Sequence, residues 1–404
     1  MNHGSDTPRD DNPPSDWDPV APETMADPHA VHRELRSRCP VPHSQRWGGF
    51  YTLTRYADVV EASRDSETFT ATRQTVIPAS PRKGLPRLPL QKDPPEHGHF
   101  RRGLNTWFKE SKMRQLEPHI EALASSLYAD VLRDGTVDFS EAFAGPFTQG
   151  SLCLLVGLDL AEARELGRLS HDYVVAVQGE DLATAGELSR QVDQFAIDLV
   201  ADRKVRPRDP DGDMVTGLLE TVDDGSPYSD EEVAGMVRLL LIGGHVVPKN
   251  FLGSAVWHLA RDADLQRRLR AEPGLMRGAV EELLRLYSAN QALVRVTTRE
   301  VEIGGRTIPE GKPVALHFLS ANQDEAVFER PEVFDPERKP NRHIAFGIGP
   351  HVCIGQSLAR MQARITLEQL LTRTAGFNVA GEPQWARWTE YGVAALKIDV
   401  ELAR

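Results

Sequence analysis

The chain has 404 residues, and a hydrophobic fraction of 40% supplies enough apolar material for a sizeable buried core. Its 47 basic and 59 acidic residues give a formal net charge of −12, so its overall field does not draw it to nucleic acid. The three cysteines, Cys39, Cys153 and Cys353, have no regular spacing, which argues against a disulfide framework and fits a reducing cytosol.

The N-terminal segment lacks the apolar core of a signal peptide, and we interpret residues 1–16 as a disordered leader. Residues 17–404 show no break in composition and predict a single domain. The longest strongly apolar run, residues 236–247, is interrupted by Arg238 and is too short to span a bilayer. We therefore expect a cytoplasmic protein with no membrane anchor.

Helical periodicity dominates the chain, which predicts a mainly α fold with a minor β-sheet region. The expected helices are residues 26–38, 114–133, 188–205, 229–260 and 272–286. A strand is expected at 49–53, and VEIGGRTIPEG predicts a hairpin with its turn at Gly304-Gly305. Residues 73–92 contain four prolines and several basic residues, and a loop of this length in a compact domain is usually functional or mobile.

The stretch FGIGPHVCIGQSLAR, residues 346–360, places Cys353 in a glycine-rich turn just ahead of an expected helix. The helix dipole and free backbone N–H groups favour a thiolate at this position. Gly347, Gly349 and Gly355 let the backbone approach a flat partner, and His351 could pair with an anionic group on it. This chemistry fits an axial thiolate ligand to heme iron.

The same stretch resembles the heme-binding signature of the cytochromes P450, the heme-thiolate monooxygenases, and the soluble bacterial members are the most similar in length. The resemblance implies heme b (iron protoporphyrin IX) between a long distal helix and the helix that follows the cysteine. It assigns Cys353 as the axial iron ligand and Phe346 as the ring on the sulfur side, with Gly355 beside them.

Other landmarks of the family follow in the expected order. EELLR contains Glu282 and Arg285, which are i,i+3 neighbours and resemble the family's structural ion pair, with Arg338 as the third partner. DPPEHGHFRR and QALVR resemble segments that contact the heme. The resemblance therefore implies that four basic residues bind the heme propionates, namely His97, Arg101, Arg295 and His351.

The distal helix departs from the family pattern. The family usually has a glycine there, followed by any residue, an acid and a threonine that organise the delivery of protons to O2. Here the sequence is Gly243, Gly244, His245, Val246 and Val247, and two valines neither donate a hydrogen bond nor hold water. Pro248 follows, so we predict a kink beside the heme that leaves the Gly244 carbonyl available to a water or to the substrate. His245 is a candidate proton donor or a packed helical histidine.

Several functions fit this departure. In the first, an organic substrate of specialised metabolism supplies the polar groups, and the product is hydroxylated or epoxidised. In the second, the enzyme couples an aromatic substrate oxidatively through C–C, C–O or C–N bonds, as related members do with cyclic dipeptides and peptides. Peroxide-driven chemistry and a non-catalytic gas-binding heme protein are further alternatives.

The resemblance also implies a substrate pocket and a redox partner. The pocket would be lined by Gly243 on the distal helix, by residues 73–92 and 172–190, and by Gln291, Val294 and Tyr391. The chain contains no reductase domain, so electrons would come from a ferredoxin and a ferredoxin reductase. Seven basic residues on two segments predict a positive docking patch for the ferredoxin, namely Arg101, Arg102, Lys109, Lys112, Arg114, Arg360 and Arg364. We expect a monomer that binds a small molecule or a small peptide.

Overall fold

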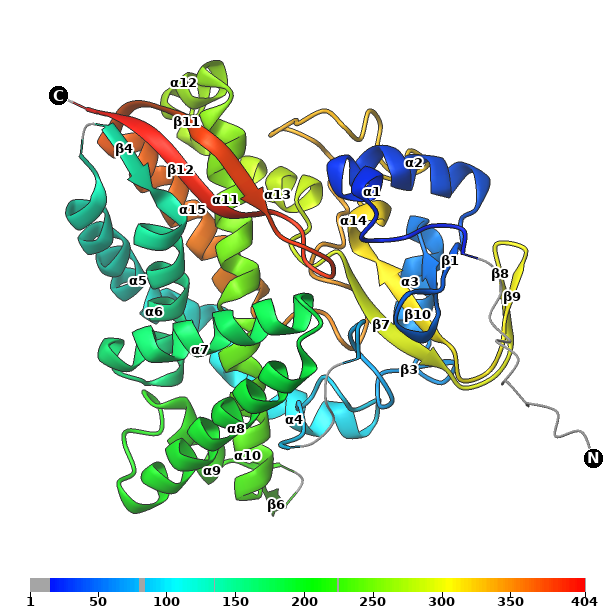
Figure 1. Cartoon of the computed structure of the whole chain (residues 1–404). Helices are drawn as coiled ribbons and strands as arrows, with labels where there is room; N and C mark the ends of the chain where they lie inside the picture. The colour runs from blue at the N-terminus through cyan, green and yellow to red at the C-terminus, as the bar shows by residue number, and fades with distance from the viewer. Residues whose placement is uncertain (1–14, 80–83, 134, 224, 404) are drawn as a thin grey trace, which may run out of the picture.

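The computed structural model describes residues 15–79, 84–133, 135–223 and 225–403. Long helices gather on one side of the molecule, and a twisted sheet with the N-terminal helices lies on the other (Figure 1). The helices are α1 (Pro22–Ala26), α2 (Pro28–Arg38), α3 (Tyr56–Arg64), α4 (Glu96–Asn105), α5 (Glu110–Val131), α6 (Gly145–Val156), α7 (Leu160–Gln178), α8 (Leu182–Val205), α9 (Met214–Glu220), α10 (Asp230–Gly243), α11 (Val246–Ala260), α12 (Ala263–Ala271), α13 (Met276–Leu286), α14 (Phe318–Ala321) and α15 (Gln356–Arg373).

The main sheet has five strands in the order β1-β2-β10-β7-β3. Strand β10 pairs in parallel with β2 and antiparallel with β7, and a second sheet has the order β11-β12-β4. The strands are β1 (His43–Ser44), β2 (Phe50–Leu53), β3 (Phe69–Thr70), β4 (Gly135–Asp138), β5 (Val222–Asp223), β6 (Ser226–Pro227), β7 (Ala292–Thr297), β8 (Val301–Ile303), β9 (Arg306–Ile308), β10 (Pro313–His317), β11 (Thr374–Trp385) and β12 (Val393–Leu402). Strands β8 and β9 form the predicted hairpin.

Capping side chains set several helix starts that periodicity alone placed differently. Asp27 accepts a hydrogen bond from the Ala30 N–H at the start of α2, and Asp181 does the same for Thr184 at the start of α8. Helix α8 therefore begins at Leu182, six residues before the predicted start at 188.

The predicted helix at 229–260 is two helices, α10 and α11, separated at Gly244 and His245. Gly243-Gly244 weakens the helix, and Pro248 falls in the first turn of α11, where a missing N–H is tolerated. A side chain at Gly244 would also be crowded, because an added Cβ would lie 3.0 Å from Leu152 Cδ1 on α6. The break confirms the predicted kink and locates it at Gly244 and His245.

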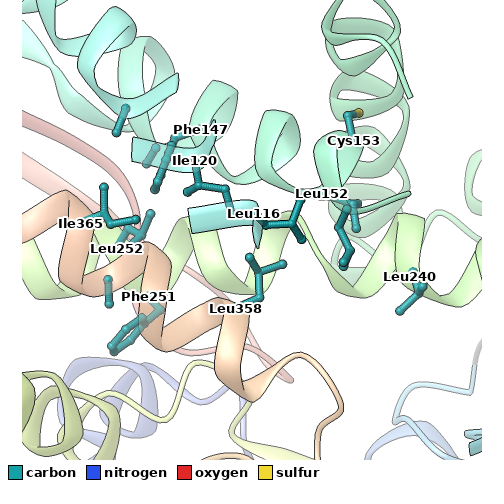
Figure 2. Packing of buried hydrophobic residues seen from close by; sticks show 14 of the residues in the cluster. Leu116, Ile120, Phe147, Leu152, Cys153, Leu240, Phe251, Leu252, Leu358 and Ile365 are labelled. Atoms are coloured by element: carbon teal, nitrogen blue, oxygen red, sulfur yellow. The ribbon is translucent and has the colours of Figure 1, made fainter. Parts of the chain in front are cut away.

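The main hydrophobic core joins the helices that surround this break. Figure 2 shows Leu116 and Ile120 of α5, Leu152 of α6, Leu252 of α11 and Ile365 of α15, which belong to one hydrophobic cluster. The segment Asp230–Ala260 is long and apolar enough to cross a membrane, but 67% of its most apolar window is buried inside the fold. Its apolar character therefore follows from its place in the core.

The predicted leader lies outside the described residues as far as residue 14. Ser15 and Asp16 belong to the fold, because the Asp16 N–H donates to the His43 carbonyl at 2.8 Å and its carboxylate pairs with Arg306. The described fold therefore includes two residues of the predicted leader.

Candidate active site

The turn before α15 is shaped by backbone hydrogen bonds and two glycines with positive φ. The Cys353 N–H donates to the Phe346 carbonyl at 2.8 Å, which closes the turn. Gly347 and Gly349 have φ of 71° and 78°, and a Cβ at Gly349 would lie 2.6 Å from the Ser63 carbonyl oxygen. Cys353 is thereby presented just ahead of the α15 N-terminus, where Gly355 is the N-cap.

The surroundings of the Cys353 sulfur act on its charge in opposite directions. The Cys353 side chain is exposed, yet desolvation by the protein around it raises the pKa of the thiol. The Gly355 N–H and the Arg101 and Arg360 guanidinium groups favour the thiolate instead. The Arg360 guanidinium also lies 4.7 Å from the centre of the Phe346 ring, which is a cation–π contact at the start of the turn.

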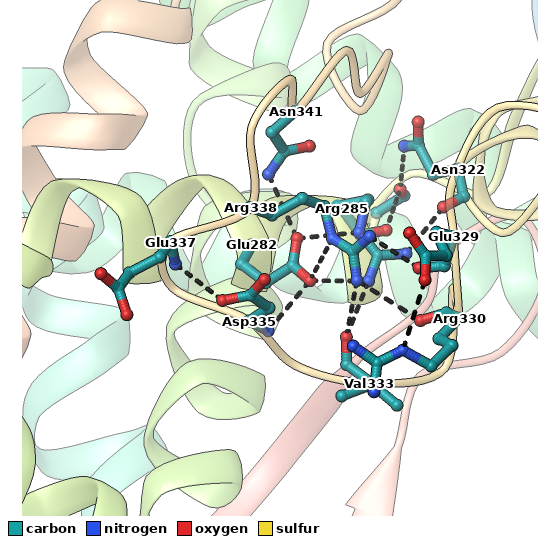
Figure 3. A network of polar contacts seen from close by, with 11 residues as sticks. Glu282, Arg285, Asn322, Glu329, Arg330, Val333, Asp335, Glu337, Arg338 and Asn341 are labelled. Carbon is teal, nitrogen blue, oxygen red and sulfur yellow. Dashed lines mark hydrogen bonds and ion pairs between the residues drawn. The ribbon is translucent and has the colours of Figure 1, made fainter.

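A buried network fixes the segment that leads into this turn (Figure 3). The Glu282 carboxylate accepts two hydrogen bonds of 2.8 Å from Arg285, and both side chains are fully buried. Arg338 donates to the same carboxylate at 2.9 Å, and Asn341 does so at 3.1 Å. Helix α13 is thereby tied to residues 333–341, and the structure brings the three predicted partners together.

Two of the four predicted propionate ligands, Arg295 and His97, lack a strong side-chain partner among the described residues, and a third, His351, has only a long contact with Asp93. Arg295 is 4% exposed, and its guanidinium donates only to the carbonyl of Val294, at 2.8 Å. The Nε2 atom of His97 is buried without a hydrogen-bond partner, the Nε2 atom of His351 lies 3.8 Å from the Asp93 carboxylate, and the two rings lie 4.4 Å apart. The fourth, Arg101, is held by the Asn105 side chain at 3.0 Å.

At the distal break the backbone of Gly243 is exposed, whereas the His245 side chain is buried against α6. Gly243 is exposed, and a Cβ added there would meet nothing within 4 Å. The His245 ring is buried against α6, with Nδ1 3.1 Å from the Thr148 hydroxyl. Burial lowers the pKa of His245 to about 3, so the ring is neutral at physiological pH. This placement favours packing over proton donation.

Comparison with known proteins decides the family. The cytochrome P450 family model matches residues 176–379. A probable cytochrome P450 127A1 from Sinorhizobium fredii is 32% identical over 89% of this chain and 86% of its own length. The cyclomarin C epoxidase CymV from Salinispora arenicola is 30% identical over 89% of both chains. The solved structure of CYP109Q5 from Chondromyces apiculatus has a TM-score of 0.86 at 28% identity and covers 95% of this chain and 97% of that one.

The chain belongs to the cytochrome P450 family. It is therefore an oxidoreductase of the heme-thiolate monooxygenase family, with heme b as its cofactor.

The residues present fit a bound heme. The buried Arg295 guanidinium has one carbonyl partner, His97 Nε2 has none, and His351 Nε2 is only 3.8 Å from Asp93, so the three form a donor set suited to carboxylates such as the propionates. Cys353 offers a sulfur ligand beside a helix N-terminus. In this P450, Cys353 would hold the iron, and Arg295, His97, His351 and Arg101 would hold the propionates.

The polar residues predicted to anchor a substrate are engaged within the P450 itself. The Gln291 side-chain amide donates to the Glu390 carbonyl at 2.7 Å, and the Tyr391 hydroxyl lies 3.3 Å from His29 Nε2. Val294, also predicted to line the pocket, is 0% exposed in a hydrophobic cluster on the main sheet. Its side chain packs with other buried residues of this cluster, such as Phe50 and Trp388.

Glu390 is a residue of this region that the sequence analysis missed. Its side chain is 7% exposed, at the turn between β11 and β12, and accepts a hydrogen bond of 2.6 Å from Asn250 on α11. The Gln178 side chain is a second donor, from the end of α7. Burial raises the pKa of Glu390 to about 7. In the sequence Thr-Glu-Tyr-Gly nothing distinguishes it from a solvated turn residue.

Replacing Glu390 with glutamine should make the P450 more stable above pH 7. Because the folded state binds the Glu390 proton more tightly than the unfolded chain does, the free energy of unfolding falls as pH rises from about 4.5 to about 7. A rise of the pKa from 4.5 to about 7 corresponds to at most about 3 kcal/mol. Denaturant unfolding at pH 5 and pH 8 should show E390Q gaining stability over the native chain only at pH 8.

The exposed Glu302→Gln substitution in β8 is the control for this measurement, because it removes the same charge from a solvated position. It should leave the pH dependence unchanged. An E390Q difference that is the same at both pH values would contradict the assignment of a buried titrating carboxyl.

Proposed function

We propose that this P450 inserts oxygen into an organic substrate of specialised metabolism, using O2 and electrons from a separate ferredoxin and its reductase. The bound heme b supplies the chemistry that activates O2. The observation that supports insertion is the similarity of the chain to P450 monooxygenases, an epoxidase among them. In the distal break, Val246 and Val247 stand where the family has an acid and an alcohol, and His245 is bonded to Thr148. Protons would then pass through water or substrate groups beside the exposed Gly243 and the half-buried Gly244, whose carbonyl has no N–H partner at Pro248.

A substrate that carries its own hydroxyl, amide or amine group fits this arrangement. Such a group could hold the water that the two valines cannot hold. The relative from Salinispora arenicola is named for epoxidising cyclomarin C, which supports oxygen insertion by a similar chain.

Oxidative coupling of an aromatic substrate is the second candidate function. The observation that favours it is the same pair of valines, because a distal face with no acid or alcohol departs from the family's arrangement for oxygen insertion. Coupling would remove two hydrogens from a cyclic dipeptide or a tyrosine- or tryptophan-bearing peptide and add no oxygen.

One experiment separates the two functions. The ferric protein is titrated with aromatic cyclic dipeptides, short aromatic peptides, macrolides and terpenoids while the Soret band is followed. Compounds that shift the spin state are then incubated with a ferredoxin, its reductase and NADPH. A product heavier by one oxygen atom supports insertion, and one lighter by two hydrogen atoms supports coupling. Spin-state shifts without any product would favour a gas-binding protein instead.

The predicted ferredoxin patch is weaker than the sequence indicated. Four of its seven cations are paired with carboxylates of this chain, because Arg102 pairs with Asp223, Arg114 with Glu110, Arg360 with Glu281 and Arg364 with Glu117 and Glu368. Lys112 donates to the Asp211 carbonyl and lies over the Trp107 ring. Lys109 is exposed and has no carboxylate partner among the described residues.

The Lys109→Glu substitution should therefore slow reduction by an acidic ferredoxin several-fold at low salt, with the difference disappearing at high salt. Stopped-flow reduction of the ferric protein measures this rate, and substrate titration should be unchanged. Arg38→Glu, at an exposed position on α2 in the sheet region, is the charge-matched control. Equal slowing by both substitutions would contradict local docking at Lys109. We also propose that the protein acts in the cytoplasm, together with the ferredoxin.

A further inference from the structure

Arg87 is a buried cation in the loop between β3 and α4. It is 9% exposed, and the Tyr173 hydroxyl on α7 accepts a hydrogen bond of 3.2 Å from its guanidinium. This is the only hydrogen bond that its side chain makes with the described residues. A guanidinium carries five N–H donors, so most of its capacity for planar, bidentate recognition is unused.

The charges around Arg87 do not balance. Arg238 on α10 and Asp193 on α8 are both buried and joined at 2.7 Å, and the second Asp193 oxygen accepts the Leu85 N–H. Asp193 is therefore already matched by Arg238. No described carboxylate forms an ion pair with Arg87, and the neighbouring residues 80–83 (Ser-Pro-Arg-Lys) contain no acid. The cluster of Arg87, Arg238 and Asp193 carries a net charge of +1.

Burial of an unpaired charge is unfavourable, so such groups are normally matched by a counter-ion. Burial lowers the pKa of Arg87, in line with a guanidinium that the protein desolvates without a matching anion. An anion that ligates two of the free N–H groups would compensate for this desolvation.

The cluster lies close to the distal helix break. The Pro86 carbonyl packs on α10, where a Cβ at Gly235 would lie 2.6 Å from its oxygen. Ser170 of α7 donates to the Leu241 carbonyl, so α7 is joined to α10 next to the break (Figure 1). Arg238 precedes the exposed Gly243 by five residues, which is about 7.5 Å along a helix. The cluster therefore lies within two helical turns of the distal break along α10.

We propose that Arg87 and Tyr173 bind a carboxylate group of the substrate and hold that end of the molecule away from the distal break. This proposal rests on the proposed function, since it names a chemical class for the substrate of the same site. The carboxylate would take a bidentate hydrogen bond from Arg87 and one hydrogen bond from the Tyr173 hydroxyl.

The test uses matched acids and esters on the holoenzyme. Dodecanoic acid and N-acetyltryptophan are titrated against their methyl esters by the Soret shift, with the native protein, Arg87→Gln, Tyr173→Phe and Arg73→Gln. Arg73 is an exposed cation of the same loop and provides the matched control. At least one acid should bind about tenfold more tightly than its ester. R87Q should lose that preference by weakening only the acid, Y173F should reduce it, and R73Q should keep it.

Denaturant unfolding without any added acid is the second measurement. R87Q should be at least as stable as the native protein, because it removes an uncompensated buried charge. Equal responses to acids and esters, including no response to either, would overturn the proposal, and so would equal weakening of both by R87Q or a clear loss of stability in R87Q. Product analysis tests the proposed function independently of the carboxylate site. Esters that bind as well as the acids and gain an oxygen atom would support oxygen insertion and contradict the carboxylate site.

Discussion

Replacing Cys353 with serine should abolish the thiolate-type Soret absorption of the reduced carbon monoxide complex and lower substrate turnover by at least about 1,000-fold. A serine hydroxyl is a far weaker iron ligand than a thiolate and donates less electron density. The backbone turn should survive, because it is closed by the Cys353 N–H and the Phe346 carbonyl, which the substitution leaves in place. Absorption spectra of the reduced protein with carbon monoxide provide the measurement.

Cys39→Ser is the matched control for this substitution. Cys39 is a half-buried free cysteine at the end of α2, so the change removes the same sulfur atom from a position in the sheet region. The C39S protein should keep both the native spectrum and the native turnover. A C353S protein that kept the thiolate-type absorption would show that Cys353 is not the iron ligand.

Replacing Glu282 with glutamine should lower the free energy of unfolding by about 3–5 kcal/mol. The native carboxylate compensates two guanidinium groups, Arg285 at 2.8 Å and Arg338 at 2.9 Å, in a fully buried position. A glutamine keeps the shape and one acceptor oxygen but removes the charge and turns an NH2 group toward the arginine or asparagine donors, so two cations lose their counter-ion. Denaturant unfolding followed by far-UV circular dichroism and by heme absorbance should detect the loss.

The heme should also be released more readily from E282Q, because the network holds residues 333–341, which lead into the cysteine turn. Glu34→Gln is the control, since Glu34 pairs with Arg38 on the exposed surface of α2 and the pair is worth less than about 1 kcal/mol. A loss in E282Q no larger than that in E34Q would contradict a structural role for the buried network.

Local preferences were sufficient to predict the turn and the break that define this site. Glycines that adopt positive φ and a following helix start placed Cys353, and the consecutive glycines with Pro248 predicted the interruption in the distal helix. The spacing of Glu282 and Arg285 likewise predicted a pair within one helical turn. Each of these features depends on backbone conformation within a few residues, which the sequence specifies directly.

The partners of individual polar side chains were decided only by the tertiary structure. The sequence could not show that His245 is bonded to Thr148 on α6, or that Asn250 and Gln178 enclose Glu390. The pairing of cations in the predicted positive patch was hidden for the same reason, because the carboxylates that pair with Arg102 and Arg364 are 121 and 247 residues away in the chain.

The sequence by itself thus determined the cysteine turn, the distal break and the ion-pair spacing, since short-range dihedral preferences and helix geometry act within a few residues. Tertiary packing decided which charges are compensated. The desolvation of Arg87 and Glu390 arises from helices and loops that meet only in the folded chain. A charge at either position looks solvated in the sequence, and its chemical role depends on how much water and how many partners the fold leaves around it.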